Sequence, residues 1–174
     1  VDITGSLYTL IVDGTAPTIS STTVAADNST IDVTFSEAVY NATGGSGALE
    51  ASDFTLSISG GTKTLSSATP SSISISGNVY TLGLNLSGTA NGSETITVVP
   101  STSTAIYDGA DNAASTSQSN NTVSLADETA PTISSTTVAA DNSTIDVTFS
   151  EAVYNDTGGS GALEAGDFTL SISG

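Results

Sequence analysis

One stretch of this chain occurs twice, and the repetition limits what the chain can fold into. Residues 15–60 return as residues 129–174 with only two changes, Ala42 against Asp156 and Ser52 against Gly166. Self-similarity at a fixed offset indicates an array of units, and the offset from Thr15 to Thr129 has the size of one compact domain. We therefore predict three parts: residues 1–14 as the last strand of a preceding or neighbouring domain, 15–128 as a complete domain, and 129–174 as the first strands of the next.

Within the complete unit, short runs of alternating apolar and polar residues indicate half-buried strands, as in Thr30–Phe35. Turn-forming pairs such as Asp27-Asn28 and Asn91-Gly92 separate these runs. About seven short strands at this spacing predict an all-β fold, an immunoglobulin-like β-sandwich repeated in tandem. The apolar positions of the runs form the predicted core: Ile31, Val33, Phe35, Phe54, Leu56, Ile58, Leu82, Leu84, Ile96 and Val98.

Two runs carry more detailed predictions about single strands. Ile19 and Val24 have opposite parity, which predicts a bulge or a change of sheet within the first strand. The run from Tyr80 to Leu86 alternates without a break, and it predicts the longest strand of the unit.

The composition excludes several classes of function. With a net charge of −17 and Lys63 as the only basic residue, the chain lacks the Lys/Arg clusters that bind nucleic acids or anionic membranes. It contains no His or Cys, so a Ser/His/Asp or Cys/His nucleophile and a disulfide are ruled out. No signal-peptide pattern opens it, and no apolar run has the length of a membrane span. We expect a non-enzymatic protein on a bacterial or archaeal exterior.

Several segments together resemble the bacterial immunoglobulin-like (Big-type) repeats of large extracellular surface proteins. They are residues 15–19 (TAPTI), 35–40 (FSEAVY), 53–54 (DF), 77–80 (GNVY) and 107–114 (YDGADNAA). The resemblance covers the complete unit and its partial copy. It implies extracellular, tandem, mostly structural modules, often stiffened by calcium. One position departs from the pattern, since Asp111 stands where such repeats commonly have glycine.

The acidic residues are expected to gather at the two ends of the sandwich, because successive loops of this fold alternate between the ends. Ca²⁺ takes six to eight hard oxygen ligands, which carboxylates and Asn side chains supply. We therefore predict calcium sites at the domain junctions. The N-terminal set is Asp13, Glu37, Asp108 and Asp111, and the C-terminal set is Asp27, Asp127 and, from the next copy, Glu151.

Simpler interpretations of these residues remain open. Asp and Asn are good turn formers, and most such residues on a surface do nothing more. The Ser and Thr richness suits exposed strands, although sequons such as Asn28-Ser-Thr also allow glycosylation.

Two functions from different classes follow. The first is a structural module of a bacterial surface stalk, filament or surface layer, whose partners are neighbouring copies joined covalently or by strand donation. The alternative is an adhesin module that binds a glycan through loop residues of Ser36–Asp53. Near-identical copies favour the spacer role, because a binding tip is usually unique.

Overall fold

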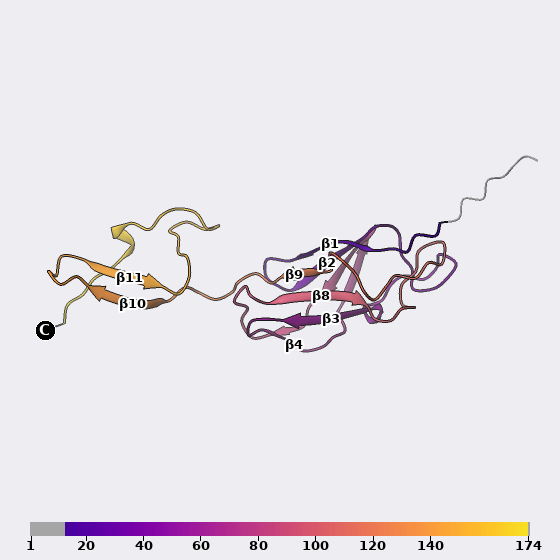
Figure 1. The fold of residues 1–174 in the computed structure, drawn as a ribbon, viewed down its shortest axis with the longest axis horizontal. Coiled ribbons are helices and arrows are strands. Elements are labelled where there is room, and N and C mark those ends of the chain that lie inside the picture. The colour runs from indigo at the N-terminus through magenta and orange to yellow at the C-terminus, as the bar shows by residue number, and fades with distance from the viewer. Residues whose placement is uncertain (1–12, 174) are drawn as a thin grey trace, which may run out of the picture. The chain divides into compact units, whose positions relative to one another are not determined.

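The computed structural model describes residues 13–173, so the predicted strand in residues 1–14 lies almost entirely outside the described residues. The described chain forms two compact units that divide between Glu128 and Thr129 (Figure 1). The first is a two-layer sandwich, and the second contains the partial copy.

The first unit is built from two antiparallel sheets. One sheet has the strand order β1-β2-β6-β5 and the other the order β3-β8-β9. The strands of the first sheet are β1 Ile19–Val24, β2 Thr30–Phe35, β6 Val79–Gly83 and β5 Ile73–Ser76; those of the second are β3 Phe54–Ser59, β8 Thr95–Pro100 and β9 Thr122–Ser124. Taken in chain order, these pairings are those of a constant-type immunoglobulin sandwich, with four strands facing three. The predicted all-β sandwich is confirmed.

The prediction of one long strand from Tyr80 to Leu86 is wrong. The run breaks after Gly83, and its last residues form β7 (Leu86–Ser87), which pairs with β4 (Thr64–Leu65) in a separate ribbon. At the break the Leu84 amide donates to the carbonyl of Ser29, 2.8 Å away. The apolar alternation continues across the break because Leu84 and Leu86 still face inward. The alternation of apolar and polar residues therefore predicts which side chains face the core, but it does not predict where the chain changes its strand partner.

The first strand contains the predicted irregularity. Ile19 pairs with Phe35 and Ser21 with Thr34, so β1 carries one extra residue between these pairs. The bulge lets Ile19 enter the core, where it is 1% exposed, despite its opposite parity to Val24.

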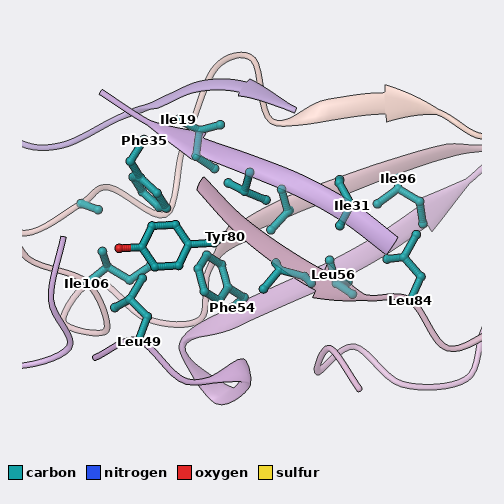
Figure 2. Close-up of a cluster of buried hydrophobic side chains, with 14 of the residues drawn as sticks. Ile19, Ile31, Phe35, Leu49, Phe54, Leu56, Tyr80, Leu84, Ile96 and Ile106 are labelled. Atoms are coloured by element: carbon teal, nitrogen blue, oxygen red, sulfur yellow. The ribbon is translucent and has the colours of Figure 1, made fainter. Parts of the chain in front are cut away.

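Side chains from both sheets meet in one hydrophobic core. Nine of the ten predicted core residues are buried, and Ile58 is half-buried and packs against them. Within this core, Phe35, Phe54 and Tyr80 form an aromatic cluster near Leu49 and Ile106, with ring centroids 5.6–6.3 Å apart (Figure 2). The Tyr80 hydroxyl donates to the Val39 carbonyl at 3.3 Å, so this buried polar group is satisfied.

The second unit repeats the local structure of the first copy. Its elements are β10 Ile133–Val138, β11 Ile145–Phe149 and the short 3-10 helix η2 Ala165–Asp167, which corresponds to η1 Ala51–Asp53. The pairing of β10 with β11 reproduces the bulge of β1. The exposure of identical side chains differs, however: Ile133 is 57% exposed against 1% for Ile19, and Leu170 is 74% exposed against 2% for Leu56.

Candidate metal centre

Two loops that are far apart in the sequence meet at the N-terminal end of the first unit. The Tyr40 amide donates to the Tyr107 carbonyl at 2.7 Å, and the Tyr107 amide donates to the Tyr40 carbonyl at 2.8 Å. This isolated bridge fixes the loop that follows β2 against the loop that follows β8. Glu37 is close to Tyr40 in sequence and Asp108 follows Tyr107, so the bridge brings the two acidic residues near each other.

Three of the predicted ligands come together there. Asp13, Glu37 and Asp108 each offer a carboxylate oxygen, and these atoms lie within 4.8 Å of one another. Asp13 is held by Asn112, whose Nδ2 donates to the Asp13 carbonyl at 3.1 Å. The Asp13 carboxylate in turn accepts a hydrogen bond from the Thr15 amide at 3.0 Å.

Asp108 is the buried member of this acidic group, with 0% of its surface exposed. Its Oδ1 accepts hydrogen bonds from the amides of Ala110 and Asn112, both at 2.8 Å. Its Oδ2 accepts one from Asn112 Nδ2 at 2.7 Å. Burial acts to raise the pKa of Asp108, but the bonds from Asn112 and Ala110 outweigh it and leave the pKa below its usual value. The buried carboxyl is therefore ionised at neutral pH.

The pKa of Glu37, the third member of the group, lies above its usual value. Burial, followed by the negative charges of Asp108 and Asp13, raises the pKa of Glu37. A cation among the three groups would remove this repulsion. The donors are all hard oxygens, and each carboxylate keeps lone pairs beyond those used in hydrogen bonds, so the set fits Ca²⁺ in chemical type. Asp13, Glu37 and Asp108 are the residues that would hold the ion.

Asp111, the fourth predicted ligand, faces another partner. Its Oδ1 accepts a hydrogen bond from the Gly44 amide, in the glycine-rich part of the loop after β2. Its backbone has a φ of 71°, in the left-handed region that glycine adopts most readily. This conformation accounts for the glycine that the resemblance implies at this position.

The predicted C-terminal set is not assembled within the first unit. Asp27 accepts hydrogen bonds from Ser29, at 3.0 Å from the amide and 2.7 Å from the hydroxyl, and these bonds lower the pKa of Asp27. The geometry is that of a turn-forming aspartate. Glu151 belongs to the second unit. The only group of three metal-ligating side chains among residues 13–173 is the N-terminal one, and calcium binding by Asp27, Asp127 and Glu151 stays a prediction.

Sequence reasoning missed two residues that organise the ends of the unit. Asn112 orders both Asp108 and Asp13, and its only signal was its place in an Asp/Asn-rich loop. Lys63 forms an ion pair with Glu128, with 2.6 Å between Nζ and Oε1. Its signal was that it is the only cation in the chain.

The loop proposed for the alternative adhesin function borders a pocket of about 360 Å³. Its lining comes from Val39 and residues 45–49 of the loop, from the two tyrosines Tyr40 and Tyr80, and from Ile75 on β5. Glycan binding at this loop stays a prediction.

Comparisons with known proteins give one structural similarity. No family model matches the chain, and no curated protein sequence matches it. Among solved structures, the chain is similar to the crystal structure of the N-terminal part of the bacterial S-layer protein SbsC, with 20% sequence identity and a TM-score of 0.46. The match covers 86% of this chain and 33% of the other. Among the residues that the structure describes, no helix is long and apolar enough to cross a membrane.

Proposed function

We propose that this chain is a structural module of a bacterial or archaeal surface stalk, filament or surface layer, made of immunoglobulin-like sandwiches in tandem. The observation that carries the proposal is the near-identity of residues 15–60 and 129–174, of which the first copy is completed into a constant-type sandwich by residues 61–128. Identical units in series supply length and stiffness. The acidic composition suits an exterior that contains calcium, because carboxylate oxygens are ligands that Ca²⁺ prefers.

The partners in this proposal are further repeats of the same kind. In the first unit, β6 pairs with β2 and β8 pairs with β3, so that strands of residues 61–128 cover the apolar side chains of the first copy. The second copy presents the same side chains, and Ile133, Leu170 and Ile172 are largely exposed. Strands equivalent to β6 and β8 would cover them. They would come from a further part of the array or from a neighbouring subunit by strand donation.

Extending the chain tests this pairing. A second copy of residues 61–128, placed directly after Gly174, should complete the second unit into a sandwich. Amide hydrogen exchange of β10 and β11 should then slow to the rates of β1 and β2, and binding of a dye for apolar surfaces should fall. A matched control carries Leu82→Asp and Ile96→Asp in the added copy only, because both side chains are fully buried in the first unit. If β10 and β11 exchange equally fast in the extended chain and its control, the array proposal is wrong.

We further propose that Asp13, Glu37 and Asp108 bind calcium and so stiffen the incoming chain. Three carboxylates within 4.8 Å of one another and the raised pKa of Glu37 support it. A Ca²⁺ ion would join Asp13, which precedes β1 on the segment that leads into the sandwich, to the loops after β2 and β8 that carry Glu37 and Asp108. Because the ion binds the folded arrangement and not the open chain, it should stabilise the fold as its concentration rises.

Calorimetric titration and thermal melting of the chain, with calcium and with EGTA, test the site. Calcium should raise Tm in the natural chain. In EGTA, Glu37→Gln should have a higher Tm than the natural chain, because one of three repelling charges is removed. The corresponding gain in the free energy of unfolding is about 0.5 kcal/mol. The same variant should gain less from calcium, because it has lost a ligand. Equal calcium responses in the natural chain and in Glu37→Gln would contradict the assignment.

A further inference from the structure

The only cationic side chain of the sequence is buried against the segment through which the chain leaves the first unit. Lys63 is 8% exposed, although lysine is almost never fully buried unless it is paired. Its Nζ donates to both carboxylate oxygens of Glu128, at 2.6 and 2.7 Å. Glu128 is the last residue of the first unit. We call Leu125–Glu128 the outgoing segment.

A buried asparagine holds the same segment from the other side. Asn28 lies in the turn between β1 and β2, with 2% of its surface exposed and a φ of 56°. Its side chain pairs with Ala126 as a neighbouring strand would: Nδ2 donates to the Ala126 carbonyl at 2.9 Å, and Oδ1 accepts from the Ala126 amide at 2.8 Å. Nδ2 also donates to Glu128 Oε1 at 2.9 Å.

Backbone hydrogen bonds complete the attachment. The Glu128 amide donates to the Ala90 carbonyl at 2.9 Å, and the Ala90 amide donates to Glu128 Oε2 at 3.1 Å. The Leu125 amide donates to the Glu94 carbonyl at 2.9 Å. Glu94 also fixes the lysine, because its buried carboxylate accepts a hydrogen bond from the Lys63 amide at 3.0 Å. Both ends of the ion pair are therefore held by the sandwich.

We propose that Asn28, Lys63 and Glu128 form a clamp that makes the outgoing segment a rigid part of the sandwich. The inference rests on the proposed function, because fixing the outgoing chain matters in a tandem array. It gives the unit two different ends. The N-terminal end gathers carboxylates around a place for a cation, and the C-terminal end carries its own cation. The Lys63 side chain is 8% exposed and that of Glu128 is 30% exposed, so salt screens this partly buried pair less than it screens fully exposed pairs.

Hydrogen exchange read by mass spectrometry, in EGTA, tests the clamp in the full chain. Lys63→Met removes the charge with a side chain of similar length. Asn28→Gly removes the bonds to Ala126 and Glu128 but keeps the turn, because glycine accepts the positive φ. Asp146→Asn, an exposed position on β11, serves as the control for a change of charge elsewhere. Exchange in the outgoing segment should rise about tenfold or more in the first two variants, as expected for local opening, and should not change in the control.

Peptides from β2 and β8 report whether the effect is local. With the clamp as proposed, their exchange in Lys63→Met and Asn28→Gly stays close to that of the natural chain. The proposal is wrong if the outgoing segment of both variants exchanges as slowly as it does in the natural chain. It is also wrong if exchange in β2 and β8 rises as much as exchange in the outgoing segment, because such a rise means general destabilisation. The array proposal is judged on β10 and β11 of the extended chain, so either idea can fail without the other.

Discussion

A buried carboxylate shows how single residues hold the turns of this sandwich together. Glu94 has no exposed surface, and its oxygens accept hydrogen bonds from three backbone amides, those of Thr62 at 2.7 Å and of Lys63 and Asn91 at 3.0 Å. These bonds, from Lys63 first, lower the pKa of Glu94 to about 2 against the opposing effect of burial. The carboxylate thus satisfies backbone amides in two separate turns, one at Thr62 and Lys63 and the other at Asn91.

This lowered pKa predicts how stability depends on pH. A group whose pKa is lower in the folded state stabilises the fold fully above its unfolded pKa, about 4.3 for Glu, and the contribution is lost as the pH falls toward the folded value. The natural chain should therefore lose stability between about pH 4.5 and pH 2. Glu94→Gln should melt several degrees lower at pH 7 and should show a shallower loss on acidification, because the titrating group is gone.

Thermal melts of both proteins across this pH range provide the measurement. Glu128, whose pKa the Lys63 ammonium and Asn28 amide also lower to about 2, titrates in the same window and contributes part of the acid dependence that remains in the variant. Parallel melting curves for the two proteins from pH 7 to pH 2 would show that Glu94 has no such role.

At the scale of elements, two turns of the first unit depend on glycine for different reasons. Gly60, in the turn after β3, has a φ of 78°, and a Cβ at this position would overlap the Ser93 carbonyl oxygen. Gly77, in the turn between β5 and β6, has a φ of 60°, but a Cβ there would meet no atom within 4 Å. Replacing either glycine therefore costs free energy for the backbone conformation, and only a replacement at Gly60 adds the cost of a close contact.

Alanine at each position tests this distinction. Gly77→Ala should destabilise by roughly 1–2 kcal/mol, the cost of a left-handed conformation. Gly60→Ala should destabilise by roughly 2–5 kcal/mol, because overpacking against backbone adds to the same conformational cost. Urea unfolding of the two variants measures the difference, and equal losses would mean that the contact with Ser93 relaxes without cost.

At the scale of the whole molecule, charge governs how an array of these units behaves. With a net charge of −17, the acidic side chains repel one another along the chain. Physiological salt screens this repulsion only between charges more than about 8 Å apart. The carboxylates of Asp13, Glu37 and Asp108 lie closer than that. Removing calcium should therefore loosen the segment at Asp13 that leads into the sandwich.

Small-angle scattering of a chain with two complete repeats checks this expectation. Its maximum dimension should be larger and better defined in calcium than in EGTA, and the difference should shrink in Glu37→Gln. A dimension that is the same under both conditions would mean that the acidic loops only form turns.

Much of the fold followed from local pattern in the sequence. Alternating apolar residues identified the strands and nearly the whole core, and opposite parity at Ile19 and Val24 predicted the bulge, because both depend on which side of a strand faces the interior. Loop order grouped Asp13, Glu37 and Asp108, because consecutive loops of a sandwich alternate between its ends.

Only the tertiary structure decided which groups become partners. The break between β6 and β7, the turn of Asp111 toward Gly44, and the pairing of Lys63 with Glu128 each join residues through long-range contacts that no periodicity encodes. The same limit explains the two copies. Near-identical sequences bury Leu56 and expose Leu170, because burial depends on the strands that pack against a residue and not on the residue itself.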